Sequence, residues 1–142
     1  TIFAINISQY RMGYKIISAK KFQTKLKATV HKSGKLGFTD AAAKELGFAS
    51  NAEPYVKFAV DEDNPSILYL INVKEGDEDS FRVNKAGNYY YVNTRLMFDS
   101  LQIDYINETV IYDMIKVEGI ENDVYRMNKR TTKRAEKEGK DM

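Results

Sequence analysis

Residues 30–38 read VHKSGKLGF, and residues 83–91 read VNKAGNYYY. Both stretches follow one pattern, V-x-K-x-G-x-apolar-x-aromatic, and they start 53 residues apart. Self-similarity at a fixed spacing is typical of a repeated supersecondary unit. The sequence therefore predicts that one small fold element occurs twice in this chain.

Each stretch predicts a β-hairpin. In the first, apolar and polar residues alternate over residues 26–30, and Gly34 supplies the positive φ that a tight turn needs. The second hairpin is expected at residues 81–92, with its turn at Gly87. Two antiparallel strand pairs are thus expected from local signals alone.

A short helix is expected after each hairpin. Thr39 is a good N-cap, because its hydroxyl group accepts a hydrogen bond from a free N–H group of the first turn. Three alanines follow, and Gly47 stands where a left-handed residue ends a helix. The first helix is therefore expected at residues 39–46. The second is expected at residues 94–101, with Asn93 as its cap.

Further strands are expected at residues 55–60, 67–73 and 109–117, because β-branched and aromatic residues dominate there. The acidic spacer that ends in Pro65 is a turn signal between the first two of them. The charged segment at residues 74–80 contains a glycine and is expected to separate the two units.

These elements predict an α+β fold of two tandem ββαβ(β) units, residues 26–73 and residues 81–117. A unit of about 45 residues buries too little apolar surface to be stable alone. The two units are therefore expected to share one core or to pair with a second chain. The second possibility favours a homodimer.

The two ends of the chain are expected outside these units. Residues 1–25 are expected to form a separate N-terminal segment. Its first part, residues 1–11, is expected either to add a strand or to precede the natural folded protein, with Met12 as its start. Residues 125–142 change to a composition of Lys, Arg, Thr, Glu and Gly, with almost no apolar residue after residue 128. Such a segment cannot bury a face, which predicts a frayed helix or a disordered basic tail.

The first unit resembles the AbrB-like swapped-hairpin transcription factors. The matching pattern is V-x-x-x-G-K-L-x-F-T at residues 30–39, followed by L-G-F at residues 46–48. The resemblance covers residues 27–73, with a weaker copy at 81–117. It implies a DNA-binding fold in which two ββαββ halves interlock and basic hairpin residues contact DNA. The corresponding residues here are His31, Lys32 and Lys35.

Charge is unevenly distributed along the chain. The net charge is +8 over residues 1–35, −10 over residues 36–124 and +4 over residues 125–142. Basic segments bind nucleic acid because each neutralised phosphate releases counterions. The alternative is that the basic ends pair with the acidic middle. The basic candidates in the C-terminal segment are Arg126, Lys129, Arg130, Lys133 and Arg134.

Tyrosines provide a second possible contact with nucleic acid. Successive tyrosines at residues 89–91 point to alternate faces of one expected strand. Tyr90, near Arg82 and Lys85, is a candidate for stacking on bases of a single strand. The alternative is that both faces of this strand are covered and the tyrosines reflect strand propensity.

Signals of catalysis are nearly absent. The chain has no cysteine and one histidine, and it contains no Gly-rich phosphate loop, G-x-S-x-G or H-E-x-x-H motif. The acidic clusters do not follow the order of an EF-hand loop. The sequence therefore predicts no enzyme, no cofactor, no metal site and no small-molecule substrate. It also carries no export signal and no apolar run long enough for a membrane helix, which favours the cytoplasm.

The sequence as a whole favours a non-catalytic nucleic-acid-binding protein, namely a DNA-binding transcription regulator. Double-stranded DNA fits the swapped-hairpin resemblance, and a single strand fits the tyrosines. The alternative is a protein–protein interaction or structural module of phage or mobile-element type. Such a module would form a homo-oligomer and would not bind nucleic acid.

Overall fold

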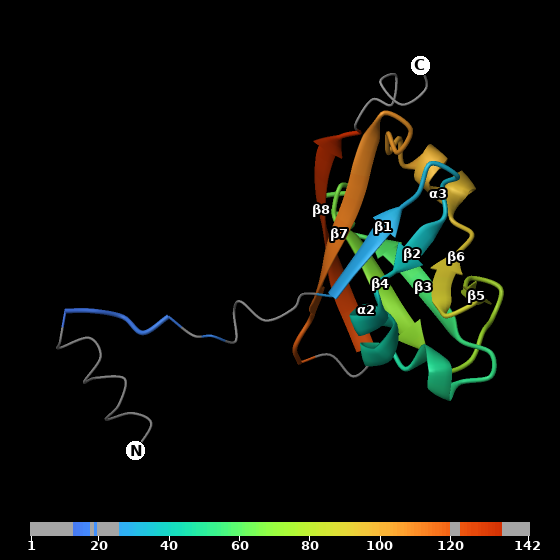
Figure 1. Ribbon diagram of the computed structural model, residues 1–142, viewed down its shortest axis with the longest axis horizontal. Helices are drawn as coiled ribbons and strands as arrows, with labels where there is room; N and C mark the ends of the chain where they lie inside the picture. The colour runs from blue at the N-terminus through green and yellow to red at the C-terminus, as the bar shows by residue number, and fades with distance from the viewer. Residues whose placement is uncertain (1–12, 18, 20–25, 120–122, 135–142) are drawn as a thin grey trace.

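Eight antiparallel strands close into a barrel in the computed structural model (Figure 1). The structure describes residues 13–17, 19, 26–119 and 123–134. The elements of the first half are β1 (Leu26–Val30), β2 (Leu36–Phe38), α2 (Asp40–Glu45), the 3-10 turn η2 (Phe48–Ser50), β3 (Tyr55–Val60) and β4 (Leu68–Val73). Those of the second half are β5 (Phe81–Ala86), β6 (Tyr89–Val92), α3 (Arg95–Ser100), β7 (Glu108–Lys116) and β8 (Asp123–Lys133).

The two halves of the chain interleave around the barrel. The strand order is β1-β2-β6-β5-β3-β4-β8-β7, and β7 pairs with β1 to close the ring. If β1 is exchanged with β5, β2 with β6, β3 with β7 and β4 with β8, every strand keeps the same kind of neighbours, and the ring has the same order. The sequence repeat therefore corresponds to a repeated strand order within one closed sheet.

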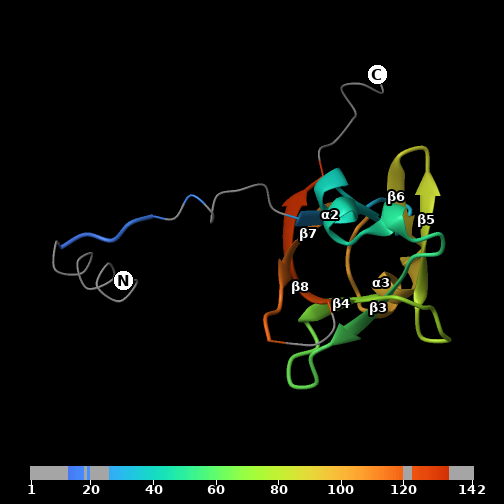
Figure 2. The same cartoon turned by 90° about the horizontal axis from the view of Figure 1, so that it is seen from below.

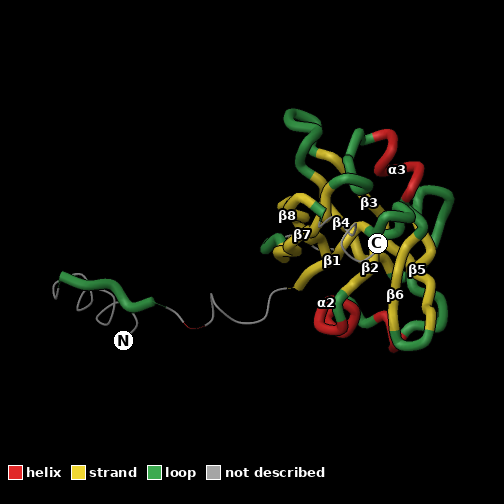
Figure 3. Tube along the Cα trace, turned by 45° about the horizontal axis from the view of Figure 1, so that its top comes forward, coloured by secondary structure: helices red, strands yellow, loops and turns green. Residues whose placement is uncertain are grey.

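The predicted α+β fold of two tandem ββαβ(β) units is wrong, because the strands of both halves form one all-antiparallel barrel. The two described α-helices have only six residues each. Helices this short cover ends of the barrel and do not form a layer of their own. Figure 3 shows the predominance of strands over helices.

The local signals for the first hairpin and helix are confirmed. Gly34 has a φ of 85° in the turn between β1 and β2. Thr39 caps α2, and its Oγ1 accepts a hydrogen bond from the N–H group of Ala42 at 3.3 Å. Gly47 is left-handed, with a φ of 71°, and follows the end of that helix.

The second copy of the repeat differs from the first in two places. Val30 pairs with Leu36 across the first hairpin, whereas Val83 pairs with Val92 across the second. The second valine and its partner are therefore three residues further apart in the sequence than the first pair. The core-facing partner in the second hairpin is Val92. The N-cap of α3 is Thr94, which corrects the expectation of Asn93.

The core fills the barrel with side chains that alternate along each strand. Ala28, Val30, Val56, Leu70, Val83 and Val110 are among the buried residues that point inward. Phe48 and Phe98 add aromatic rings near α2 and α3, which lie towards opposite ends of the barrel (Figures 1 and 2). The two halves thus share one core within a single chain.

Strand β8 occupies the first half of the segment expected to be a disordered or frayed tail. It runs antiparallel to β7 from Tyr125, opposite Lys116, to Lys133, opposite Glu108. It also pairs with β4, and its inward residues Tyr125 and Met127 are buried. Pairing on both sides stabilises a segment whose own composition is polar. Residues 135–142 of the expected tail lie outside the described residues, as do most of residues 1–25.

None of the described helices has the length and apolar character needed to cross a membrane.

Candidate nucleic-acid interface

Four neighbouring strands, in the order β1-β2-β6-β5, form a part of the barrel without any acidic residue. Residues 26–38 and 81–92, which supply these strands and their turns, contain five Lys or Arg residues, one His and no Asp or Glu. We call this surface the cationic wall. Its basic residues are Lys27, His31, Lys32, Lys35, Arg82 and Lys85.

Strand alternation sets the direction of two of these cations. Ala28 is buried in the barrel, so Lys27, the residue before it on β1, points outward. Val83 is buried in β5, so its neighbour Arg82 also points outward and is exposed. The wall therefore presents cations from its first and its last strand.

Lys35, in the turn that leads into β2, is held against the wall by an aromatic ring. Its Nζ lies 4.7 Å from the centre of the Tyr91 ring, on the adjacent strand β6. Tyr91 itself lies directly opposite Gly37 and Asn84. A cation–π contact limits the freedom of the lysine side chain while leaving the ammonium group able to contact an anion.

Gly37 allows Tyr89 to lie across β2. A Cβ atom on Gly37 would collide with the Tyr89 hydroxyl group, which forms a hydrogen bond with Nε2 of His31. Partial burial lowers the pKa of His31, and the nearby charges of Arg134 and Lys35 lower it further. Burial raises the pKa of the Tyr89 hydroxyl group. The pair is therefore neutral at neutral pH and joins β6 to the β1–β2 turn.

Tyr90 is less open to bases than the sequence suggested. It points inward at the end of the barrel, where Lys85 Nζ lies 5.5 Å from its ring centre and the Phe48 ring lies 5.6 Å away. Its ring is thus already in contact with a cation and with an aromatic neighbour. This arrangement favours Lys85 as a phosphate contact more than Tyr90 as a stacking platform.

A polar pocket of about 460 Å³ lies where the η2 loop meets β5 and β6. It brings together three predicted residues, Arg82, Lys85 and Tyr90, that are separated in the sequence. Its remaining lining comes from Phe48, Ala49, Asn51, Ala52, Pro54, Val83, Asn84 and Tyr91. Among the described residues, no carboxylate lines this pocket.

The predicted basic residues of β8, namely Arg126, Lys129, Arg130 and Lys133, do not join the cationic wall, because β7 separates β8 from β1. Arg134 follows β8 and lies close enough to His31 for its charge to act on that side chain. Arg130 forms an ion pair with Asp113, with Nε 2.7 Å from Oδ2. Arg134 donates from Nη2 to the carbonyl oxygens of Tyr105 and Glu108, at 2.9 and 3.1 Å. These two arginines therefore have structural partners. The other three, Arg126, Lys129 and Lys133, are exposed.

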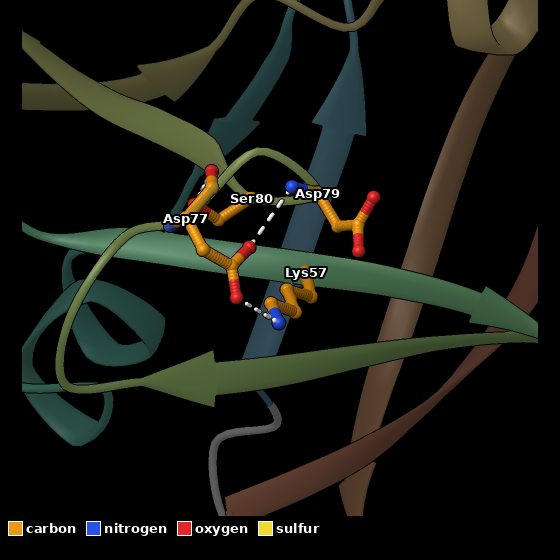
Figure 4. A network of polar contacts seen from close by, with 4 residues as sticks. All are labelled: Lys57, Asp77, Asp79 and Ser80. Carbon is orange, nitrogen blue, oxygen red and sulfur yellow. Dashed lines mark hydrogen bonds and ion pairs between the residues drawn. The ribbon is translucent and has the colours of Figure 1, made fainter.

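The acidic segment at residues 74–80 is held outside the wall, against β3 (Figure 4). Lys57 Nζ lies 2.6 Å from Oδ2 of Asp77, and the N–H group of Asp79 donates to the other carboxylate oxygen at 2.9 Å. The hydrogen bond with Asp77 raises the pKa of Lys57, and the bond from Lys57 lowers the pKa of Asp77. This contact helps to keep negative and positive surfaces apart.

Three contributors to the site were missed by sequence reasoning. Lys27 was recognisable, because it alternates with buried residues in the first expected strand. Asn84 lies on the second expected hairpin, but no local signal distinguishes it. Asn51 reaches the pocket from a loop more than 30 residues away in sequence, so only the fold brings it there.

Comparison of the chain with protein-family models, with curated proteins and with solved structures found no match. In the described part of the chain, no three His, Asp or Glu side chains lie together in a way that could hold a metal ion.

Proposed function

We propose that this chain is a non-catalytic nucleic-acid-binding protein whose cationic wall contacts the phosphate backbone. The single observation that carries the proposal is the composition of that wall: five Lys or Arg residues and no carboxylate on four neighbouring strands and the turns that join them. Among described ion pairs, none involves a residue of this wall. Its cations are therefore available to an external anion.

The geometry of the wall suits a repeating anionic ligand. Lys35 and Lys85 rest on tyrosine rings, which reduces the side-chain entropy that phosphate binding would cost. Each phosphate contact releases condensed counterions and adds a salt-dependent contribution to the affinity. Several such contacts side by side are what a polynucleotide offers and a single small anion does not.

DNA is the favoured polynucleotide, and transcription regulation is the proposed role. Support comes from the resemblance to AbrB-like proteins, which places His31, Lys32 and Lys35 at DNA-contacting positions. These three residues lie in the β1–β2 turn, at the border of the wall. The interleaved order of the two halves also agrees with the interlocking that the resemblance implies.

Fluorescence anisotropy with labelled duplex and single-stranded oligonucleotides tests this proposal. Replacing Lys32 and Lys35 together with Glu should abolish binding and leave the melting temperature nearly unchanged. The matched control replaces Lys44 and Lys74, which are exposed elsewhere, with Glu and makes the same change in net charge. If both double variants weaken binding equally, net charge acts without a specific surface and the wall is rejected.

The second candidate is a protein–protein interaction module that forms a homo-oligomer. Exposed apolar side chains favour it, notably Leu96 on α3, which is 77% exposed, and Ile115 on β7, which is 55% exposed. The barrel shares its core within one chain, so a homodimer would form through such surface residues. Light scattering that shows a defined oligomer, with no affinity for any oligonucleotide, would favour this candidate.

A further inference from the structure

The polar pocket beside β5 has the chemistry of a nucleotide site. Two cations of β5, Arg82 and Lys85, line it from alternate faces of that strand, and the carboxamides of Asn51 and Asn84 add neutral hydrogen-bonding groups. Among the described contacts, neither the Arg82 guanidinium group nor the Asn84 amide has a hydrogen-bond partner. Asn51 uses only Oδ1, which accepts from the N–H group of Glu53 at 3.0 Å, so its NH₂ group remains available.

These groups match the two ends of a nucleotide. Arginine and lysine bind phosphate oxygens through charge-assisted hydrogen bonds. Asparagine both donates to and accepts from a base edge, as it does with adenine in known complexes. The volume of about 460 Å³ lies within the range of roughly 300–1,000 Å³ for small-ligand pockets. One nucleotide fits a space of this volume.

The shape of the pocket favours an unpaired nucleotide. The pocket is lined by the η2 loop on one side and by β5 and β6 on the other, so a base has to leave its stack to enter it. Unpaired bases are presented in this way by single strands, whereas a duplex must first be opened.

We propose that this pocket holds one unpaired nucleotide of a single strand, with its phosphate on Arg82 and Lys85 and its base edge on Asn51 and Asn84. The inference rests on the proposed function, because the cationic wall has to bring the strand to the pocket. It adds a strand preference that the wall alone does not give.

The test compares a labelled single strand with a hairpin duplex of the same sequence, in one buffer at one salt concentration. Asn84→Ala and Asn51→Ala should each weaken single-strand binding about tenfold and leave duplex binding unchanged. Asn88→Ala, in the exposed β5–β6 turn and outside the pocket, is the matched control and should change neither affinity. Circular dichroism melting checks that every variant folds.

A second measurement does not depend on variants. Adding adenosine, guanosine, cytidine or uridine monophosphate should shift the side-chain amide NMR signals of Asn51 and Asn84, with weaker binding than the strand shows. Equal binding of strand and duplex, with no effect of either Asn variant, would overturn the pocket and leave the wall standing. A mononucleotide that binds as tightly as the strand would also overturn it, in favour of a free-nucleotide site. If neither oligonucleotide binds, the proposed function itself fails.

Discussion

Thr94 Oγ1 donates a hydrogen bond to the carbonyl oxygen of Gly34, at 2.9 Å, and so joins the start of α3 to the β1–β2 turn. The two residues are 60 positions apart, and the Thr94 side chain is completely buried. The Arg95 side chain packs against Gly34, where an added Cβ atom would collide with it. The second half of the chain therefore supports the turn that carries His31 and Lys32.

We expect Thr94→Val to lower the free energy of unfolding by about 1–3 kcal/mol, because the buried Gly34 carbonyl would lose its partner while side-chain volume is kept. Urea unfolding followed by circular dichroism measures this change. Thr94→Ser keeps the hydroxyl group and loses one methyl group, so it should cost about 1 kcal/mol. A Thr94→Val variant as stable as the unchanged protein would show that the hydrogen bond contributes nothing.

Gly37→Ala should displace Tyr89 and break its hydrogen bond with His31, because the added Cβ atom would occupy the position of the tyrosine hydroxyl group. The chemical shifts of the single histidine would then move towards those of an exposed imidazole. Tyr89→Phe removes the same hydrogen bond without the collision and serves as the comparison. Unchanged histidine signals in both variants would contradict the contact.

Stability should fall as the pH drops below about 6.5, the ordinary pKa of His31. The fold lowers this pKa, so the unfolded chain binds the proton more readily and acid favours unfolding. The stability that neutral His31 contributes is fully present above the pKa that this histidine has in the unfolded chain. It is lost as the pH falls through the lower pKa that it has in the folded protein. His31→Gln should flatten this part of the stability profile, measured by thermal melting between about pH 7 and pH 5. The same slope in both proteins would assign it to other groups.

At alkaline pH, stability should fall from about pH 10 upward because of two buried tyrosines. Burial raises the pKa of Tyr112 to about 12, and burial together with Glu45 and Asp123 raises that of Tyr125 to about 12. The unfolded chain loses these protons near pH 10, so their contribution is present below that value and is lost as the pH rises through about 12. Ultraviolet absorbance of tyrosinate measures the titration. Tyr112→Phe should remove its share, and an unchanged titration would refute the assignment.

Lys35→Gln should reduce the slope of log K against log salt concentration by about 0.9 for duplex DNA, the value for one phosphate contact. Lys57→Gln is the control, because Lys57 lies on β3 and already pairs with Asp77. Anisotropy titrations at several salt concentrations measure both slopes. Equal slopes for Lys35→Gln and the unchanged protein would remove Lys35 from the interface.

The sequence by itself determined the local elements. Gly34 and Gly87 mark the two hairpin turns, and Thr39 and Gly47 mark the start and end of the first helix. Alternation along residues 26–30 shows which side chains face the core. These features depend on the dihedral preferences and hydrogen bonds of neighbouring residues, so a single stretch of chain contains the information they need.

Only the tertiary structure decided which strands are neighbours. Alternation identifies a buried face but not the strand beside it, so the pairing of β2 with β6 that joins both hairpins into one wall was not predictable. Strand β8 depends on partners rather than on its own apolar residues, since β4 and β7 supply its backbone hydrogen bonds. The pocket between Asn51 and Asn84 likewise exists only once the barrel closes. Contacts between distant residues are fixed by the packing of the whole chain, which no local pattern contains.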